Sequence, residues 1–147
     1  MRFEDLSFAE KIHNLQKFHK SLNKNLFNGE LSNVMMDIRN LKNADPCVAV
    51  FHPGAILFDL NFYDLMDSCA TQKKQACCAA QIILHEMIHQ YIHEKGLKDS
   101  SDHGAVFQRE AEAHGLHSIY ENECIKEERL TLIGCVAIEN FRFTGKK

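Results

Sequence analysis

The residues best suited to chemistry form the pentapeptide His85-Glu86-Met87-Ile88-His89, an H-E-x-x-H motif. Residues four apart lie on one face of a helix, so His85 and His89 can each direct a ring nitrogen at the same point. A third ligand would complete a zinc site with one position open to water, the arrangement typical of catalytic zinc. Glu86 could then act as the general base that takes a proton from zinc-bound water as the water attacks a peptide carbonyl.

Two ways of continuing the motif do not fit this chain. The metzincin pattern would need a glycine at position 92 and a histidine at position 95, where the chain has Ile92 and Lys95. His93 extends the four-residue spacing, but three histidines on one straight helix would spread over about 12 Å along its axis. That span is too long for one tetrahedral ion, so we expect His93 to be an exposed histidine near the helix end.

The segment after the motif offers two kinds of third ligand. A gluzincin-like site would use a glutamate from the next helix, Glu110 or Glu112. We favour His103, because it begins that helix after a loop that could fold back, and because Gly104 permits close backbone approach. The expected cofactor is therefore one Zn²⁺ ion held by three histidines, a ligand set that also binds other divalent metals.

Four further residues are candidates for a supporting role. Asp102 could orient a ligand histidine by accepting an imidazole N–H, although capping of a helix explains it equally well. His114 could contact substrate or stand behind the ligands, with a partly exposed helix histidine as the alternative. Tyr91 and Tyr120 could donate to an oxyanion, with packing around a satisfied hydroxyl as the alternative.

The first element expected is a helix that begins near residue 7. Ser7 and Glu10 have the spacing of a capping box, and Asn28-Gly29 would end the helix. Its apolar residues recur at helical intervals and should form one buried stripe: Phe8, Ile12, Leu15, Leu22 and Leu26.

Three strands should follow this helix. Residues 34–39 alternate apolar and polar side chains, as in a half-buried strand. Residues 47–51 and 55–60 flank His52-Pro53-Gly54 and predict a hairpin, so we expect a small antiparallel sheet of about three strands. The segment 55–60 is the candidate edge strand for pairing with an extended substrate.

The second half of the chain should supply the helices that carry the site. Residues 72–96 read as a long helix that contains the motif and is closed by Gly96. The next helix should run from about His103 to Tyr120 and be capped by Ser101 or Asp102. Residues 129–143 have strand character without a clear place. The fold class predicted is α+β and zincin-like, as one domain over 1–147 with a core at about 7–122 and an extension at 123–147.

Composition limits the other possibilities. The chain of 147 residues carries 17 basic and 20 acidic residues, and this net charge of −3 does not favour a nucleic-acid-binding surface. The charged N-terminal segment lacks the apolar core of a signal peptide, and no run of about 18 apolar residues occurs, so we expect no membrane contact and a cytoplasmic or nuclear protein. The six cysteines form no C-x-x-C pair and should be free, buried thiols.

The two predicted metal segments resemble a known family. "LHEMIHQY" followed by "DHGAVFQREA" is similar to the SprT-like zinc metallopeptidases, which include the Spartan proteases. The upstream "LNKNLFNGELSNVMMDI" also resembles the first helix and strand of that family, so the likeness covers roughly residues 10 to 120. The resemblance implies that His85, His89 and His103 bind zinc and that Glu86 is the catalytic base. The 147 residues contain no C-x-x-C pair, so we expect neither the zinc ribbon of many bacterial members nor the separate DNA-binding regions of the Spartan proteins.

Three functions compete on this reading. The leading hypothesis is a zinc-dependent endopeptidase that acts on a protein or peptide substrate. The first alternative is a non-catalytic, zinc-stabilised interaction module. The second, suggested by the resemblance and disfavoured by the net charge, is a protease that acts on DNA-bound or crosslinked proteins.

Overall fold

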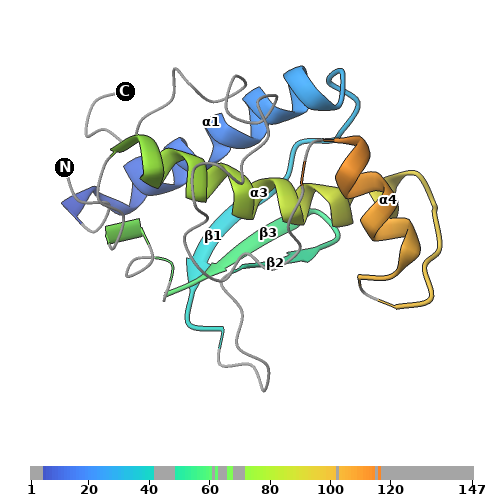
Figure 1. The fold of residues 1–147 in the computed structure, drawn as a ribbon. Coiled ribbons are helices and arrows are strands. Elements are labelled where there is room, and N and C mark those ends of the chain that lie inside the picture. The colour runs from blue at the N-terminus through green and yellow to red at the C-terminus, as the bar shows by residue number, and fades with distance from the viewer. Residues whose placement is uncertain are drawn as a thin grey trace.

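The computed structural model describes residues 5–41, 49–60, 62, 66–67, 72–101, 103–114 and 116. The elements appear in the order α1 (Phe8–Leu26), β1 (Met35–Arg39), β2 (Ala49–His52), β3 (Ala55–Asp59), α3 (Gln72–Glu94) and α4 (Ala105–Ala113). The α+β class is thereby confirmed (Figure 1). The predicted strand character at 129–143 and the extension at 123–147 lie outside the described residues.

Helix α1 begins as its sequence predicts. The Ser7 hydroxyl accepts from the Glu10 amide at 3.2 Å, and the Glu10 carboxylate accepts from the Ser7 amide at 2.9 Å, which completes the capping box. At the other end, Asn28 and Gly29 both adopt positive φ values, 53° and 73°. Phe8 was expected in the core but is 54% exposed, whereas Leu15 and Leu22 of the same stripe are fully buried.

The sheet is mixed rather than antiparallel. Its strand order is β1-β3-β2, with β2 antiparallel to β3 as the predicted hairpin and β1 parallel to β3. Alternating burial is the same for either strand direction, so the pattern at 34–39 could not reveal this. Strand β3 lies in the centre, and the prediction that residues 55–60 form an edge strand is therefore wrong.

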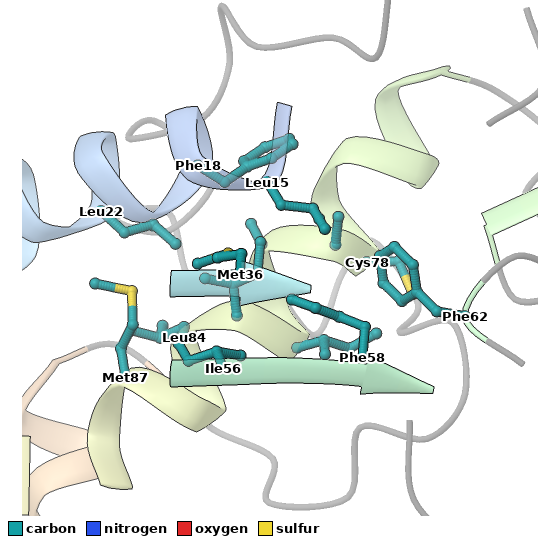
Figure 2. Packing of buried hydrophobic residues seen from close by; sticks show 14 of the residues in the cluster. Leu15, Phe18, Leu22, Met36, Ile56, Phe58, Phe62, Cys78, Leu84 and Met87 are labelled. Carbon is teal, nitrogen blue, oxygen red and sulfur yellow. The ribbon is translucent and has the colours of Figure 1, made fainter. Parts of the chain in front are cut away.

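The core lies between the sheet and the two long helices. Helices α1 and α3 lie on the same side of the sheet (Figure 1). Side chains from both helices meet those of β1 and β3 there (Figure 2). The residues labelled in that view are Leu15, Phe18, Leu22, Met36, Ile56, Phe58, Phe62, Cys78, Leu84 and Met87.

Helix α3 ends at a glycine, as expected. Gly96 has a φ of +67°; its amide donates to the His93 carbonyl, and the Leu97 amide donates to the Ile92 carbonyl at 3.0 Å. These two bonds form a Schellman motif, which satisfies carbonyls that the helix leaves open. In the part of the chain that the structure describes, no helix combines the length and the hydropathy that a membrane span requires.

Helix α4 is shorter than predicted and is capped differently. It runs from Ala105 to Ala113, and the Leu116 amide closes its end on the Ala111 carbonyl at 2.8 Å. The N-cap residue is Gly104, which has no side chain that could accept from the first-turn amides, and Asp99 instead accepts from the Phe107 amide. Asp102 and residues 117–120 lie outside the described residues.

Candidate metal centre

Three histidines converge where α3 meets the start of α4. His85 and His89 lie on one face of α3, and His103 reaches them from the loop that precedes α4. The His103 Nε2 atom lies 3.0 Å from Nε2 of His85 and 3.3 Å from Nε2 of His89. These three residues lie close enough to hold a metal ion, as the spacing and the favoured third ligand predict.

The donor set fits a small cation. Zinc binds histidine nitrogen at about 2.0–2.1 Å, so two nitrogens of a tetrahedral site lie about 3.3 Å apart. The Nε2–Nε2 separations from His103 to His85 and to His89 are close to that value. Protons alone satisfy this arrangement poorly, because the single Nε2 hydrogen of a neutral His103 can point at only one of its two neighbours. A cation coordinated by all three nitrogens removes the conflict.

Phe107 forms an apolar wall beside the three histidines. Its side chain is fully buried, and its ring centroid lies 4.8 Å from that of His85, 4.6 Å from His89 and 4.8 Å from His103. One aromatic ring therefore contacts all three imidazoles and restricts their orientations. His85 is buried, whereas His89 and His103 are only partly buried, so the site opens toward solvent on their side.

Glu86 places a carboxylate next to the three histidine nitrogens. It is 6% exposed, and its Oε2 atom lies 3.9 Å from Nε2 of His85. That separation is too long for a direct hydrogen bond and leaves the carboxylate beside the point on which the three nitrogens converge. The motif thus brings an acid and two of the three histidines together from the same helix.

A buried polar network lies behind His89. The Gln90 amide nitrogen donates to the Ser32 carbonyl and to the Glu94 carboxylate, each at 2.8 Å. Its oxygen lies 2.9 Å from Nε2 of His19, so this nitrogen of His19 must donate. Burial lowers the pKa of His19, partly offset by the Gln90 hydrogen bond and the Glu94 charge. The network ties α1 and the segment before β1 to the residue that follows His89.

Tyr91 and His114 meet in a separate aromatic cluster. The His114 ring stacks on Phe27 with centroids 4.3 Å apart and lies 5.0 Å from the Tyr91 ring. Nδ1 of His114 lies 2.7 Å from the Glu110 carbonyl oxygen, which fixes a proton on that nitrogen. These contacts favour the packing alternative for Tyr91, and His114 is a partly buried histidine at the C-cap of α4. Contact with substrate stays a prediction for both residues.

The remaining candidates are placed as follows. His93 lies near the exposed end of α3, with its ring 5.9 Å from that of Phe51. Among the described residues, the group that could hold an ion consists of His85, His89 and His103, and it includes neither Glu110 nor Glu112. Asp102 and Tyr120 lie outside the described residues.

Asp99 is a site residue that the sequence did not point to. Its Oδ2 atom accepts from the Phe107 amide at 2.8 Å, and its Oδ1 atom accepts from the Ser100 amide at 2.8 Å. The Phe107 amide is the main cause that lowers the pKa of the Asp99 carboxyl. Asp99 accepts from an amide eight residues ahead, a separation that no local capping signature covers.

A scan against protein-family models, a search of curated proteins and a search of solved structures all find no match for this chain.

Proposed function

We propose that this protein is a zinc-dependent metallopeptidase that hydrolyses peptide bonds at the centre formed by His85, His89 and His103. The observation that carries the proposal is the convergence of three Nε2 atoms next to the buried Glu86 carboxylate. Three protein ligands, on a site that opens to solvent, leave room for a fourth ligand, which separates catalytic from structural zinc sites. The resemblance of both metal segments to SprT-like metallopeptidases supports the same reaction.

The roles of the residues follow from their positions. Zinc bound to the three histidines would polarise a substrate carbonyl and lower the pKa of water to about 7. Glu86 accepts the proton of the attacking water on its carboxylate and then gives it to the leaving amine. Phe107 excludes water from the rear of the three imidazoles and keeps their Nε2 atoms turned inward.

Strand β2 is the better candidate for binding an extended substrate. It is an edge strand of the described sheet, whereas β3 has a partner on both sides. Phe51 of β2 contacts His93 near the end of α3, so this edge runs beside the helix that carries the motif. A peptide backbone could add to β2 by main-chain hydrogen bonds, which would make the enzyme tolerant of substrate sequence.

The test compares wild type with Glu86→Gln in metal content and in cleavage of an unfolded protein substrate. General-base catalysis contributes about 10²–10⁴-fold, so Glu86→Gln should keep its zinc and lose at least about a hundredfold in rate. Asp5→Asn, the same carboxylate-to-amide change at an exposed position, should match wild type. A chelator should abolish wild-type cleavage, and added zinc should restore it.

Two outcomes would overturn parts of the proposal. Activity that survives Glu86→Gln excludes the assigned base. The second outcome is that zinc binding depends on all three histidines but wild type cleaves no unfolded substrate. The protein would then be a zinc-stabilised interaction module. In that case chelation would lower the melting temperature, and no hydrolysis would be detected with or without zinc.

A further inference from the structure

We propose that Asp99 is the positioning residue for the third ligand: it holds the loop between α3 and α4 in the shape that returns His103 to the helix. The inference rests on the proposed metal centre and adds a residue that the H-E-x-x-H motif and the third histidine do not include. Asp99 acts through the backbone of its neighbours.

The carboxylate of Asp99 joins the two ends of the segment that contains His103. Oδ1 binds the amide of Ser100, at the start of this segment, and Oδ2 binds the amide of Phe107, in the first turn of α4. His103 lies between these two anchor points. The negative charge also faces the N-terminal end of α4, where free amides and the helix dipole favour an anion.

Gly104 makes this approach of Asp99 possible. A Cβ atom built on Gly104 would lie 2.8 Å from Cγ of Asp99 and still closer to its Oδ1 atom. The backbone of Gly104 has φ −78° and ψ −161°, which other residues adopt without strain. The glycine is therefore required for the space that the Asp99 carboxylate occupies.

Two residues of α4, Phe107 and Gln108, also hold His103 in place. The side-chain amide of Gln108 donates to the His103 carbonyl at 3.1 Å, and the Phe107 ring contacts the His103 ring. Without the Asp99 carboxylate, the Phe107 amide loses its acceptor and the loop gains other conformations. The apparent metal affinity is then proportional to the fraction of molecules in which His103 is already in place. The remaining molecules must first order the loop before all three histidines can bind the ion.

The experiment measures zinc affinity by competition with a chromophoric chelator in Asp99→Ala, Gly104→Ala and the double variant. Changes in residues that support metal ligands cost about 10–100-fold in affinity, and we expect about tenfold for each single variant. Because Gly104→Ala acts by displacing Asp99, the double variant should bind zinc no more weakly than Asp99→Ala alone. Asp5→Asn serves as the charge-matched control and should keep wild-type affinity.

Co²⁺ spectra add a readout of ligand geometry. The visible absorption of tetrahedral Co²⁺ should weaken in Asp99→Ala, while melting of the metal-free protein reports any general loss of stability. If Asp99→Ala does not fold, Asp99→Asn decides, because it keeps the shape and a neutral acceptor and should lose less affinity.

Each result bears on a different claim. Wild-type affinity in Asp99→Ala, or losses that add in the double variant, would overturn the positioning role. Zinc affinity that is unaffected by His103→Ala would instead overturn the proposed three-histidine centre. Since the second measurement does not involve Asp99, failure of the inference and failure of the proposed function are distinguishable.

Discussion

Truncation of Phe107 tests whether one side chain supports both the fold and the metal centre. Its ring is fully buried and contacts the imidazoles of His85, His89 and His103 at centroid distances of 4.6–4.8 Å. Phe107→Ala would remove that ring and leave a cavity against three polar residues. We expect a large loss of stability in the metal-free protein and a second, separate loss of zinc affinity.

The magnitude follows from the burial. A phenylalanine buries about 150–250 Å², and about 25 cal/mol per Å² gives roughly 5 kcal/mol as an upper estimate. Measured Phe→Ala changes in cores cost about 3–5 kcal/mol, so we expect about 4 kcal/mol. In a domain near 150 residues, 1 kcal/mol shifts the melting temperature by about 2–4 °C, which predicts a fall of about 8–16 °C.

The assay is urea denaturation of the metal-free protein in excess chelator, repeated with saturating zinc. Phe8→Ala is the matched control, since it makes the same truncation at a side chain that is 54% exposed. It should cost less than about 1 kcal/mol, because most of Phe8 is in water in the folded state and alanine favours the helix. The chelator removes any contribution of zinc to the difference between the two variants.

Two results would refute this reasoning. A Phe107→Ala variant that loses less than about 1 kcal/mol would show that Phe107 is not packed as described. Equal losses in the two variants would show that burial does not separate them, and the placement of α4 against α3 would then be wrong.

Two further predictions concern other parts of the fold. Burial lowers the pKa of the His19 imidazole in the folded protein. As the pH falls below about 6.5, the imidazole therefore takes up a proton in the unfolded chain before it does so in the folded protein. The free energy of unfolding is retained above that pH and declines below it, by up to about 1.4 kcal/mol per pH unit. Urea denaturation from pH 8 to pH 5 in chelator should show this decline, and His19→Gln should reduce the slope, whereas an unchanged slope would contradict the assignment. Gly96→Ala should lower the free energy of unfolding by about 1 kcal/mol, because Gly96 has a φ of +67°, which alanine adopts only with strain. No steric clash adds to this loss, since a Cβ atom on Gly96 would meet no atom within 4 Å. A melting scan in chelator that shows no change for Gly96→Ala would contradict the Schellman motif.

The convergence of His85 and His89 could be predicted because helical geometry is local. His85 and His89 are four residues apart, and this spacing alone puts both on one face of α3. The capping box of Ser7 and Glu10 is local in the same sense, and the structure confirms it. The return of His103 was expected from its position after a loop, and the structure confirms that as well.

The features that sequence reasoning missed depend on distant contacts. The parallel pairing of β1 with β3 joins Met35 to Ala55, twenty positions along the chain, and alternation within one strand carries no information about its partner. The exposure of Phe8 likewise depends on what packs against the start of α1, which periodicity within the helix does not reveal. The cap on α4 comes from Asp99 rather than from a residue next to the helix, so a search for local capping residues could not find it.

The length of the outer strands has a consequence for self-association. Exposed sheet edges can add strands from other molecules, and native proteins limit this with short edge strands and charged side chains. Strand β2 has four residues and ends at the exposed His52. Strand β1, on the opposite edge, carries Asp37 and Arg39, which pair at 2.6 Å. In the described sheet, the edge that could accept a short extended peptide is thus too brief to serve as a template for a growing aggregate.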